Sequence, residues 1–152
     1  MKSLLLLSLV SFFATAYPGP RNFTDAEEPV RQTLRLEVDN VKAAKGKIWV
    51  GIYQSEADFL DREKARLVYV DVSTTGHTFV DIPDLVVGQK YALGIFHDVN
   101  DNGEFDTNWL GLPAEPWAFS GEPKTRLRLP RFEEVSFWFA DGAKHRLRLR
   151  KW

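Results

Sequence analysis

The chain has 152 residues, contains no cysteine and carries a formal net charge of −1 at pH 7. A chain of this length can form one hydrophobic core, so we expect a single domain. The lack of cysteine excludes disulfides, thiol chemistry and a cysteine-linked lipid anchor. The near-neutral charge gives no general attraction to nucleic acid, and we expect no nucleic-acid partner.

The N-terminus has the pattern of a secretory signal peptide. Lys2 precedes an apolar stretch from Ser3 to Phe13, and Ala14-Thr15-Ala16 offers a small-residue cleavage site. Because this stretch is too short to cross a bilayer, we predict a signal peptide over residues 1–16 and no membrane span. The predicted location is therefore secreted or periplasmic.

Residues 17–30 are predicted to form a flexible leader, and residues 31–152 a single β-sandwich domain. The leader is polar and contains prolines and acidic side chains. Asn22-Phe23-Thr24 within it is a glycosylation sequon, which has meaning only in a host that glycosylates.

Short segments with alternating side chains fill the predicted domain. In the first, Leu34, Leu36 and Val38 alternate with charged residues, which is typical of a strand with one buried face. The predicted strands are 34–38, 48–52, 67–72, 77–82, 91–97, 135–140 and 146–149. Turn residues separate them, so we predict an all-β fold: a two-sheet antiparallel sandwich of about seven strands, immunoglobulin-like or transthyretin-like. One short helical turn is predicted near 55–64, with Ser55 as its N-cap.

A long stretch without periodicity follows His97, and its first part has the register of an EF-hand calcium loop. Calcium takes about 6–8 oxygen ligands, which a loop must supply from alternate positions. With Asp98 as the first position, the ligand positions are occupied by Asp98, Asn100, Asn102, Glu104 and Asp106. Gly103 permits the sharp turn at the sixth position. We therefore predict one bound Ca²⁺, to which Glu104 contributes its backbone carbonyl.

The twelfth position of the loop departs from the EF-hand pattern. An EF-hand has a bidentate Glu there, whereas this chain has Trp109, which leaves the loop one carboxylate short. Glu115 lies in a segment stiffened by Pro113 and Pro116, and we hypothesise that it folds back to complete the metal shell. The alternative is a metal-free turn in which Asp and Asn side chains bond their own backbone.

Two tryptophans, Trp109 and Trp117, flank the proline-rich return of the loop. Paired aromatic side chains on a loop can stack on sugar rings or anchor a protein partner. This interpretation gives an interaction surface for an envelope glycan or another exported protein. The alternative is that both side chains cap the open end of the sandwich and shield the ion.

Segments along most of the chain resemble a bacterial secreted family known as domain of unknown function 2141. The resemblance rests on residues 46–53, 91–106, 111–116, 119–120 and 130–137. The central segment, which contains the Asx-rich loop, is its specific part. The resemblance implies a small exported β-sandwich with such a loop and no assigned reaction, so it leaves the function open.

The common catalytic motifs are missing from the sequence. It has no Gly-x-Ser-x-Gly elbow, no His-Glu-x-x-His, no glycine-rich phosphate loop and no cysteine nucleophile. Our leading prediction is a non-enzymatic monomer whose calcium ion orders the Trp109 and Trp117 surface. Catalytic groups are arranged by geometry, so an extracytoplasmic hydrolase using His97, Asp98 and Glu115 is the alternative. A purely structural envelope protein is the third.

Overall fold

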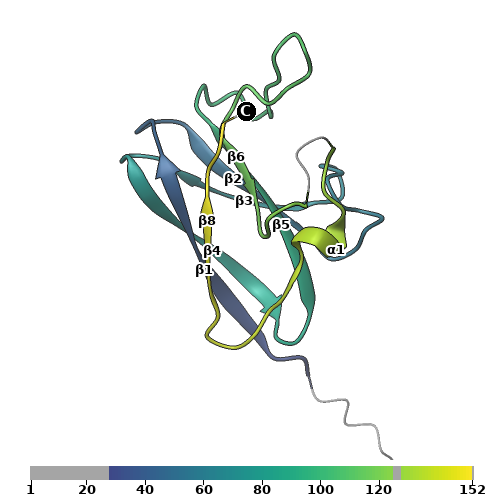
Figure 1. Ribbon diagram of the computed structural model, residues 1–152. Coiled ribbons are helices and arrows are strands. Elements are labelled where there is room, and N and C mark those ends of the chain that lie inside the picture. Colours follow the sequence, from purple (N-terminus) through teal and green to yellow (C-terminus); the bar gives the residue numbers. More distant parts are fainter. Residues whose placement is uncertain (1–27, 125–127, 152) are drawn as a thin grey trace, which may run out of the picture.

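The structure, a computed structural model, describes residues 28–124 and 128–151, which form two β-sheets packed face to face (Figure 1). The elements are β1 (Arg31–Val41), β2 (Lys47–Tyr53), β3 (Arg66–Asp71), β4 (Gly76–Val86), β5 (Lys90–Asp98), β6 (Trp117–Phe119), α1 (Phe132–Val135), β7 (Phe137–Trp138) and β8 (Lys144–Arg148). One sheet has the strand order β4-β1-β8, and the other has the order β3-β2-β5-β6 with β7 paired to β5. The prediction of an all-β, two-sheet sandwich is confirmed.

The predicted antiparallel arrangement is wrong for one strand pair. β8 runs parallel to β1, with Arg35 beside Lys144 and Asp39 beside Arg148. After β7 the chain leaves the five-stranded sheet and crosses to the other sheet. This crossing brings β8 alongside β1 in the same direction, as parallel neighbours require.

The predicted helical turn near 55–64 is also wrong, because this segment forms successive hydrogen-bonded turns. Leu60 has φ 65°, a left-handed conformation that interrupts a right-handed helix. The Ser55 hydroxyl donates to the Asp58 carboxylate at 2.7 Å instead of capping a backbone N–H. The short helix is α1, inside a stretch that the sequence predicts in part as strand. Glu56 supports it, since its carboxylate accepts a hydrogen bond from Phe132 N at 2.7 Å.

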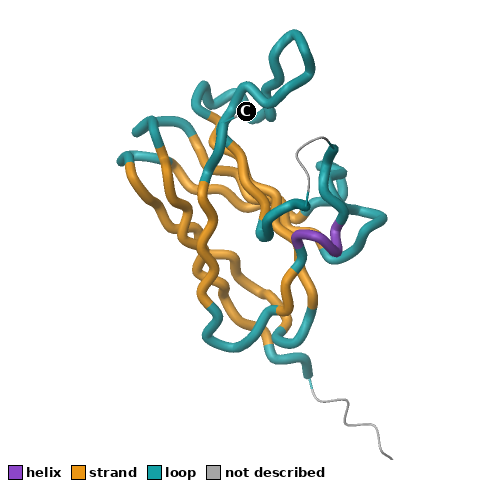
Figure 2. The backbone as a smooth tube through the Cα atoms, viewed as in Figure 1, coloured by secondary structure: helices purple, strands orange, loops and turns teal. Residues whose placement is uncertain are grey.

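The core lies between the two sheets and is formed by the alternating apolar residues of the sequence. On β1 the buried residues are Leu34, Leu36 and Val38, each 0% exposed, and Val41 at 1%, and alternate residues of β2 and β5 join them in the core. Burial of each such side chain contributes about 1.5–3 kcal/mol. Figure 2 shows that the strands make up the body of the molecule, whereas the loops extend from its ends.

A second apolar cluster lies on the outer face of the five-stranded sheet. Tyr53, Ala92, Phe132 and Val135 form it, and the turns at 59–65 pack against them. α1 and these turns cover only part of the face. Nearer the long loop, the described residues of this face line a groove that becomes important for the candidate site.

The predicted signal peptide and the leader up to residue 27 lie outside the described residues. Within 28–124 and 128–151, the structure contains no helix with the length and apolar character needed to cross a bilayer.

Candidate functional site: a rigid loop beside an aromatic groove

The Asx-rich loop is wound around the carboxylate of Asp98, which ends β5 and is 0% exposed. Its Oδ1 accepts a hydrogen bond from Asn102 N at 3.1 Å, and its Oδ2 accepts one from Gly103 N at 2.8 Å. Asp101 and Gly103 both adopt left-handed conformations, with φ 58° and 77°. Glycine is therefore favoured at the sixth position by its backbone, since a Cβ there would meet no atom within 4 Å.

A second carboxylate, that of Asp106, accepts hydrogen bonds from the side chains of Asn100 and Asn102. Asn100 Nδ2 donates to it at 2.8 Å, and Asn102 Nδ2 donates to its two oxygens at 3.2 and 3.1 Å. Asn102 Oδ1 accepts from Glu104 N at 2.8 Å. The side chains of the third, fifth and ninth positions are thus joined by hydrogen bonds, and Asp98 at the first position is linked to them through the backbone N–H of Asn102.

Glu115 folds back onto this network. Its carboxylate is largely buried and accepts hydrogen bonds from Val99 N at 3.0 Å and from Asp106 N at 3.4 Å. Burial raises the pKa of Glu115, the two N–H donors lower it, and the nearby charges of Asp98 and Asp106 raise it further. The return of Glu115 thus brings a third carboxylate to the loop.

Two acidic side chains of the loop point away from it. Glu104 accepts a hydrogen bond from Arg62 at 3.1 Å, and Asp101 forms an ion pair with Lys47. The hydrogen bond with Asp101 raises the pKa of Lys47. Across the described part of the chain, no three His, Asp or Glu side chains are grouped as a metal site would require. The carboxylates that do converge are held by N–H donors.

His97 and Asp98 lie on opposite faces of β5. His97 is paired with Ile48 of β2, is 0% exposed, and has its Nε2 2.8 Å from Lys45 O. Asp98 instead reaches Trp49 on the outer face. A hydrolase using His97, Asp98 and Glu115 lacks the common face that a catalytic His and carboxylate need.

A groove of about 460 Å³ occupies the open part of the outer face, next to the loop. Its floor is the pair Gly51 and Gly94, which lie side by side on β2 and β5. Two glycines paired in strand interiors leave the sheet without side chains at that point. The main apolar side chains around the floor are Trp49, Tyr53, Leu60, Phe96, Phe105, Trp117, Phe119 and Leu129.

The two floor glycines differ in the space that each leaves for a side chain. A Cβ on Gly51 would lie 3.0 Å from the Tyr53 hydroxyl, so the lack of a side chain there lets the Tyr53 ring lie over the sheet. A Cβ on Gly94 would lie 3.6 Å from Leu60 Cδ2 and from the Phe119 ring, which is ordinary contact. Gly94 is therefore the floor position at which a Cβ can be added at ordinary contact distances.

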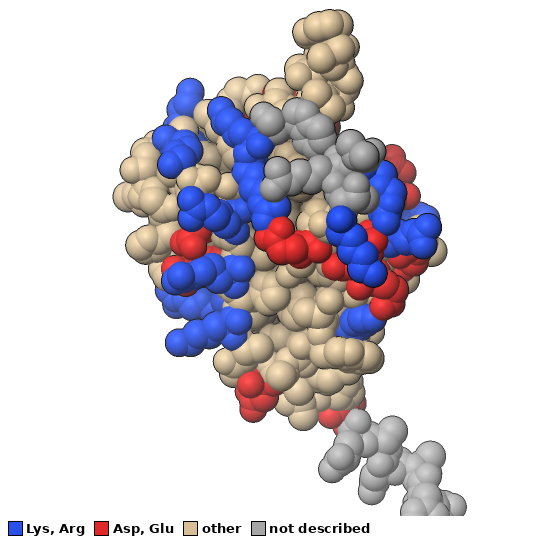
Figure 3. Space-filling view, viewed as in Figure 1, with Lys and Arg blue, Asp and Glu red and all other residues tan. Residues whose placement is uncertain are grey.

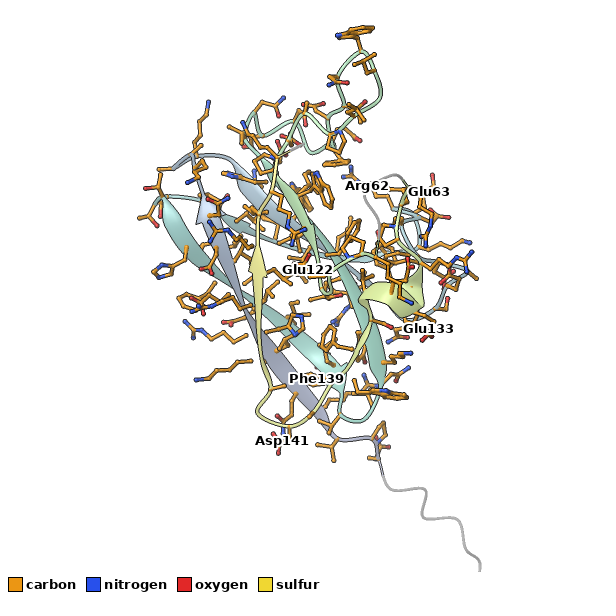
Figure 4. The ribbon with its side chains drawn as sticks, in the orientation of Figure 1. Arg62, Glu63, Glu122, Glu133, Phe139 and Asp141 are labelled. Atoms are coloured by element: carbon orange, nitrogen blue, oxygen red, sulfur yellow. The ribbon has the colours of Figure 1, made fainter. Side chains whose placement is uncertain are left out.

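The Asx-rich loop forms one wall of the groove. The Phe105 ring packs on Phe96 of β5 with ring centroids 5.3 Å apart. Arg62, from the turns on the other side, donates to Gly103 O at 2.5 Å and lies 6.0 Å from the centre of the Trp49 ring. Figure 4 shows Arg62 and Glu63 together on the side of these turns that faces the long loop. The network inside the loop therefore also holds the shape of the groove.

Trp109 and Trp117 occupy different environments. Trp117 is partly buried, packs on Phe119 at 5.3 Å and lines the groove. Trp109 is 91% exposed beside a tip that Asn108 fixes, since Asn108 Oδ1 accepts from Leu110 N and Leu112 N. The end of the loop projects from the body, and no charged side chain is visible on it in Figure 3. Of Trp109 and Trp117, therefore, only Trp117 lies at the groove.

Sequence reasoning missed the groove, although a signal for it was present. On β2 the face opposite the core carries Trp49, Gly51 and Tyr53, where an exposed sheet face usually carries polar residues. On β5 the same face carries Gly94 and Phe96. Aromatic residues around strand glycines indicate a surface that something else approaches closely.

One protein family matches most of the chain. The sequence model of the family described as uncharacterized protein conserved in bacteria (DUF2141) matches residues 36–146, and the chain belongs to this family. The matched region includes both the Asx-rich loop and the floor of the groove. No curated protein and no solved structure matches the chain.

Proposed function

We propose that this member of the DUF2141 family is a non-catalytic binding protein whose ligand site is the aromatic groove. The observation that carries the proposal is the glycine-paired floor, enclosed by aromatic side chains around a space of about 460 Å³. Ligand pockets have volumes of about 300–1,000 Å³ and are lined mainly by apolar and aromatic groups. The groove has both properties.

The groove is held in shape before any ligand arrives. Phe105 and Trp49 on the loop side are fixed by contacts with Phe96 and Asp98. A wall that is already ordered loses little conformational entropy when a ligand binds, which favours affinity. A flat apolar group bound among these side chains would remove their aromatic edges from water, worth about 25 cal/mol per Å² of apolar surface.

Titration with N-phenyl-1-naphthylamine, a neutral aromatic dye that fluoresces in apolar sites, tests the groove. We expect saturable binding to the full-length protein and at least about a tenfold loss in Gly94→Val, because the new side chain occupies the floor. Trp138→Ala removes an exposed aromatic side chain outside the groove and is the matched control. Equal binding by wild type and Gly94→Val, with both folded, would show that the groove is not the site.

A second candidate function, binding of Ca²⁺ in the loop, is favoured by the position of Glu115. Burial raises the pKa of Glu115, and the charges of Asp98 and Asp106 raise it further, so both of these carboxylates repel that of Glu115. A divalent cation among them would relieve this repulsion. Asn100 and Asn102 now turn Nδ2 toward Asp106, and rotation of each amide would present Oδ1 to the ion instead.

Calorimetry of chelator-treated protein tests the calcium proposal, with Asp106→Asn as the variant. Asp106 is the suitable position because its carboxylate accepts hydrogen bonds from the Asn100 and Asn102 amides, whereas Asp98 also holds backbone N–H groups. We expect heat of binding and a higher melting temperature with Ca²⁺ in the wild type, and neither in the variant. Absence of both effects in the wild type at millimolar Ca²⁺ would exclude the ion and leave the groove proposal intact.

We also propose that the protein is exported, as its first 16 residues suggest. Export would bring it together with envelope glycans and other exported proteins, the partner classes predicted for the surface of Trp109 and Trp117. N-terminal sequencing of the protein purified from its source tests this proposal. A mature chain beginning at Tyr17 is expected, and an intact Met1 in a cytoplasmic fraction would contradict it.

A further inference from the structure

We propose that the groove takes a flat, apolar ligand that carries one anionic group, and that Arg62 binds this group. The inference rests on the proposed function of the groove and deepens it, since it names the chemical class of the ligand and the residue that selects it.

The polar side chains that line the groove are donors. Among the described lining residues they are Trp49, Tyr53, Arg62, Trp117 and Arg128, and no Asp, Glu, Asn, Gln or His is present. Arginine and tryptophan only donate hydrogen bonds, and the tyrosine hydroxyl is the single group that can also accept one. Burial raises the pKa of Tyr53, which keeps its hydroxyl protonated and able to donate.

One of these donors has no partner. Within the described part of the chain, Trp117 Nε1 is buried without a hydrogen bond, whereas Trp49 Nε1 donates to Asp98. A buried donor without an acceptor is unfavourable, and this one is covered by neighbouring protein atoms.

A lining of donors selects against neutral sugars. Each sugar hydroxyl both donates and accepts, and here its hydrogen would find side-chain acceptors only at Tyr53. Burying such hydroxyls without partners would be unfavourable. An aromatic acid needs no side-chain acceptor, because its ring can pack among the aromatic side chains of the groove and its anionic oxygens only accept.

The two arginines differ in their freedom to bind an anion. Arg128 donates to both oxygens of Glu134, at 2.7 and 2.8 Å, and this pairing lowers the pKa of Glu134 to about 2. Arg128 is therefore already engaged in a two-point ion pair. Arg62 meets Glu104 through one contact of 3.1 Å, with both side chains exposed to water. Such exposed pairs contribute little to stability, so a ligand anion can replace Glu104 at small cost.

The backbone contact of Arg62 keeps its charge at the groove. Its Nη2 donates to Gly103 O at 2.5 Å, and its guanidinium lies 6.0 Å from the centre of the Trp49 ring. If an anion replaces Glu104, this contact still fixes the side chain between loop and floor. The positive charge therefore lies beside the groove, where the anionic group of a bound aromatic ring can reach it.

Two dyes that share one ring system test the inference. N-phenyl-1-naphthylamine is neutral, and 1-anilinonaphthalene-8-sulfonate is the same skeleton with a sulfonate. We expect the wild type to bind the sulfonate more tightly than the neutral dye, and Arg62→Gln to reduce the ratio of the two affinities by about fivefold. Arg66→Gln removes an equal charge from neighbouring β3 and is the matched control. Added salt should weaken only binding of the sulfonate.

The outcomes separate the two proposals. If Gly94→Val abolishes binding of both dyes but Arg62→Gln leaves their ratio unchanged, the groove binds ligands and the role of Arg62 is refuted. If Gly94→Val changes neither, the groove itself is refuted. If Trp109→Ala removes binding of either dye, the dye binds at the loop tip, which also contradicts the groove.

Discussion

The indole Nε1–H of Trp49 donates a hydrogen bond to Oδ2 of Asp98 across 3.3 Å, and this contact joins the floor of the groove to the Asx-rich loop. Trp49→Phe keeps an aromatic ring but removes the donor. We expect a loss of about 1 kcal/mol in the free energy of unfolding, measured by urea denaturation. Trp138→Phe, at an exposed position, should lose less than half of that amount. Equal losses would mean that the hydrogen bond does not stabilise the fold.

Gly46 brings the turn before β2 against the start of the loop. A Cβ at this position would lie 2.0 Å from Asp98 O, so Gly46→Ala must displace the backbone where the loop begins. We expect a loss on the order of 3–5 kcal/mol. Gly88→Ala has nearly the same φ, 80° against 73°, but meets nothing within 4 Å, so it should lose only about 1–2 kcal/mol. Similar losses in the two variants would show that left-handed strain, and not the close approach, dominates.

Ser120 connects β5 to α1. Its hydroxyl accepts a hydrogen bond from Leu93 N at 2.8 Å and donates one to Val135 O at 2.5 Å. Ser120→Ala should therefore destabilise the protein by about 1–3 kcal/mol, because it leaves two buried backbone groups without this partner. The Ser136 hydroxyl is buried and unpartnered within the described residues, so Ser136→Ala should change stability by less than about 0.5 kcal/mol. Thermal melting of both variants measures the difference.

The ion pair of Arg128 and Glu134 predicts an acid-dependent loss of stability. The folded-state pKa of Glu134 is about 2, below its ordinary value of 4.5. The stabilisation is therefore complete above about 4.5 and declines as the pH falls through about 2. The melting temperature of the wild type should fall across this range more steeply than that of Glu134→Gln. Glu133→Gln, which leaves the pair intact, should behave like the wild type.

Alternation of apolar residues predicted the core because a strand with one buried face has a period of two. That rule places Leu34, Leu36 and Val38 correctly without knowledge of their partners. It could not find β6, whose three residues are too few to show a period. It also could not find α1, since this one turn depends on Glu56, which is distant in sequence. Parallel pairing of β8 follows from the path of the chain, which local patterns do not encode.

The loop was predictable in part because its residue spacing is local. The fold-back of Glu115, hypothesised from the two prolines, agrees with its contacts to Val99 and Asp106. Calcium in the loop stays a prediction. The groove was not predictable from spacing, because Gly51 and Gly94 become a floor only when β2 and β5 pair in register. The hydrogen bond from Arg62 to Gly103 O was not predictable either, because it joins two loops that are far apart in sequence.

The indole N–H signals of the five tryptophans give the most direct test of the aromatic groove as a ligand site. In a ¹⁵N-labelled sample titrated with N-phenyl-1-naphthylamine, each indole is assigned by substitution with phenylalanine. We predict that the signals of Trp49 and Trp117 shift in a saturable manner, because both rings line the groove, while those of the exposed Trp109 and Trp138 stay in place. Shifts confined to Trp109 or Trp138, with Trp49 and Trp117 unmoved, would contradict the account.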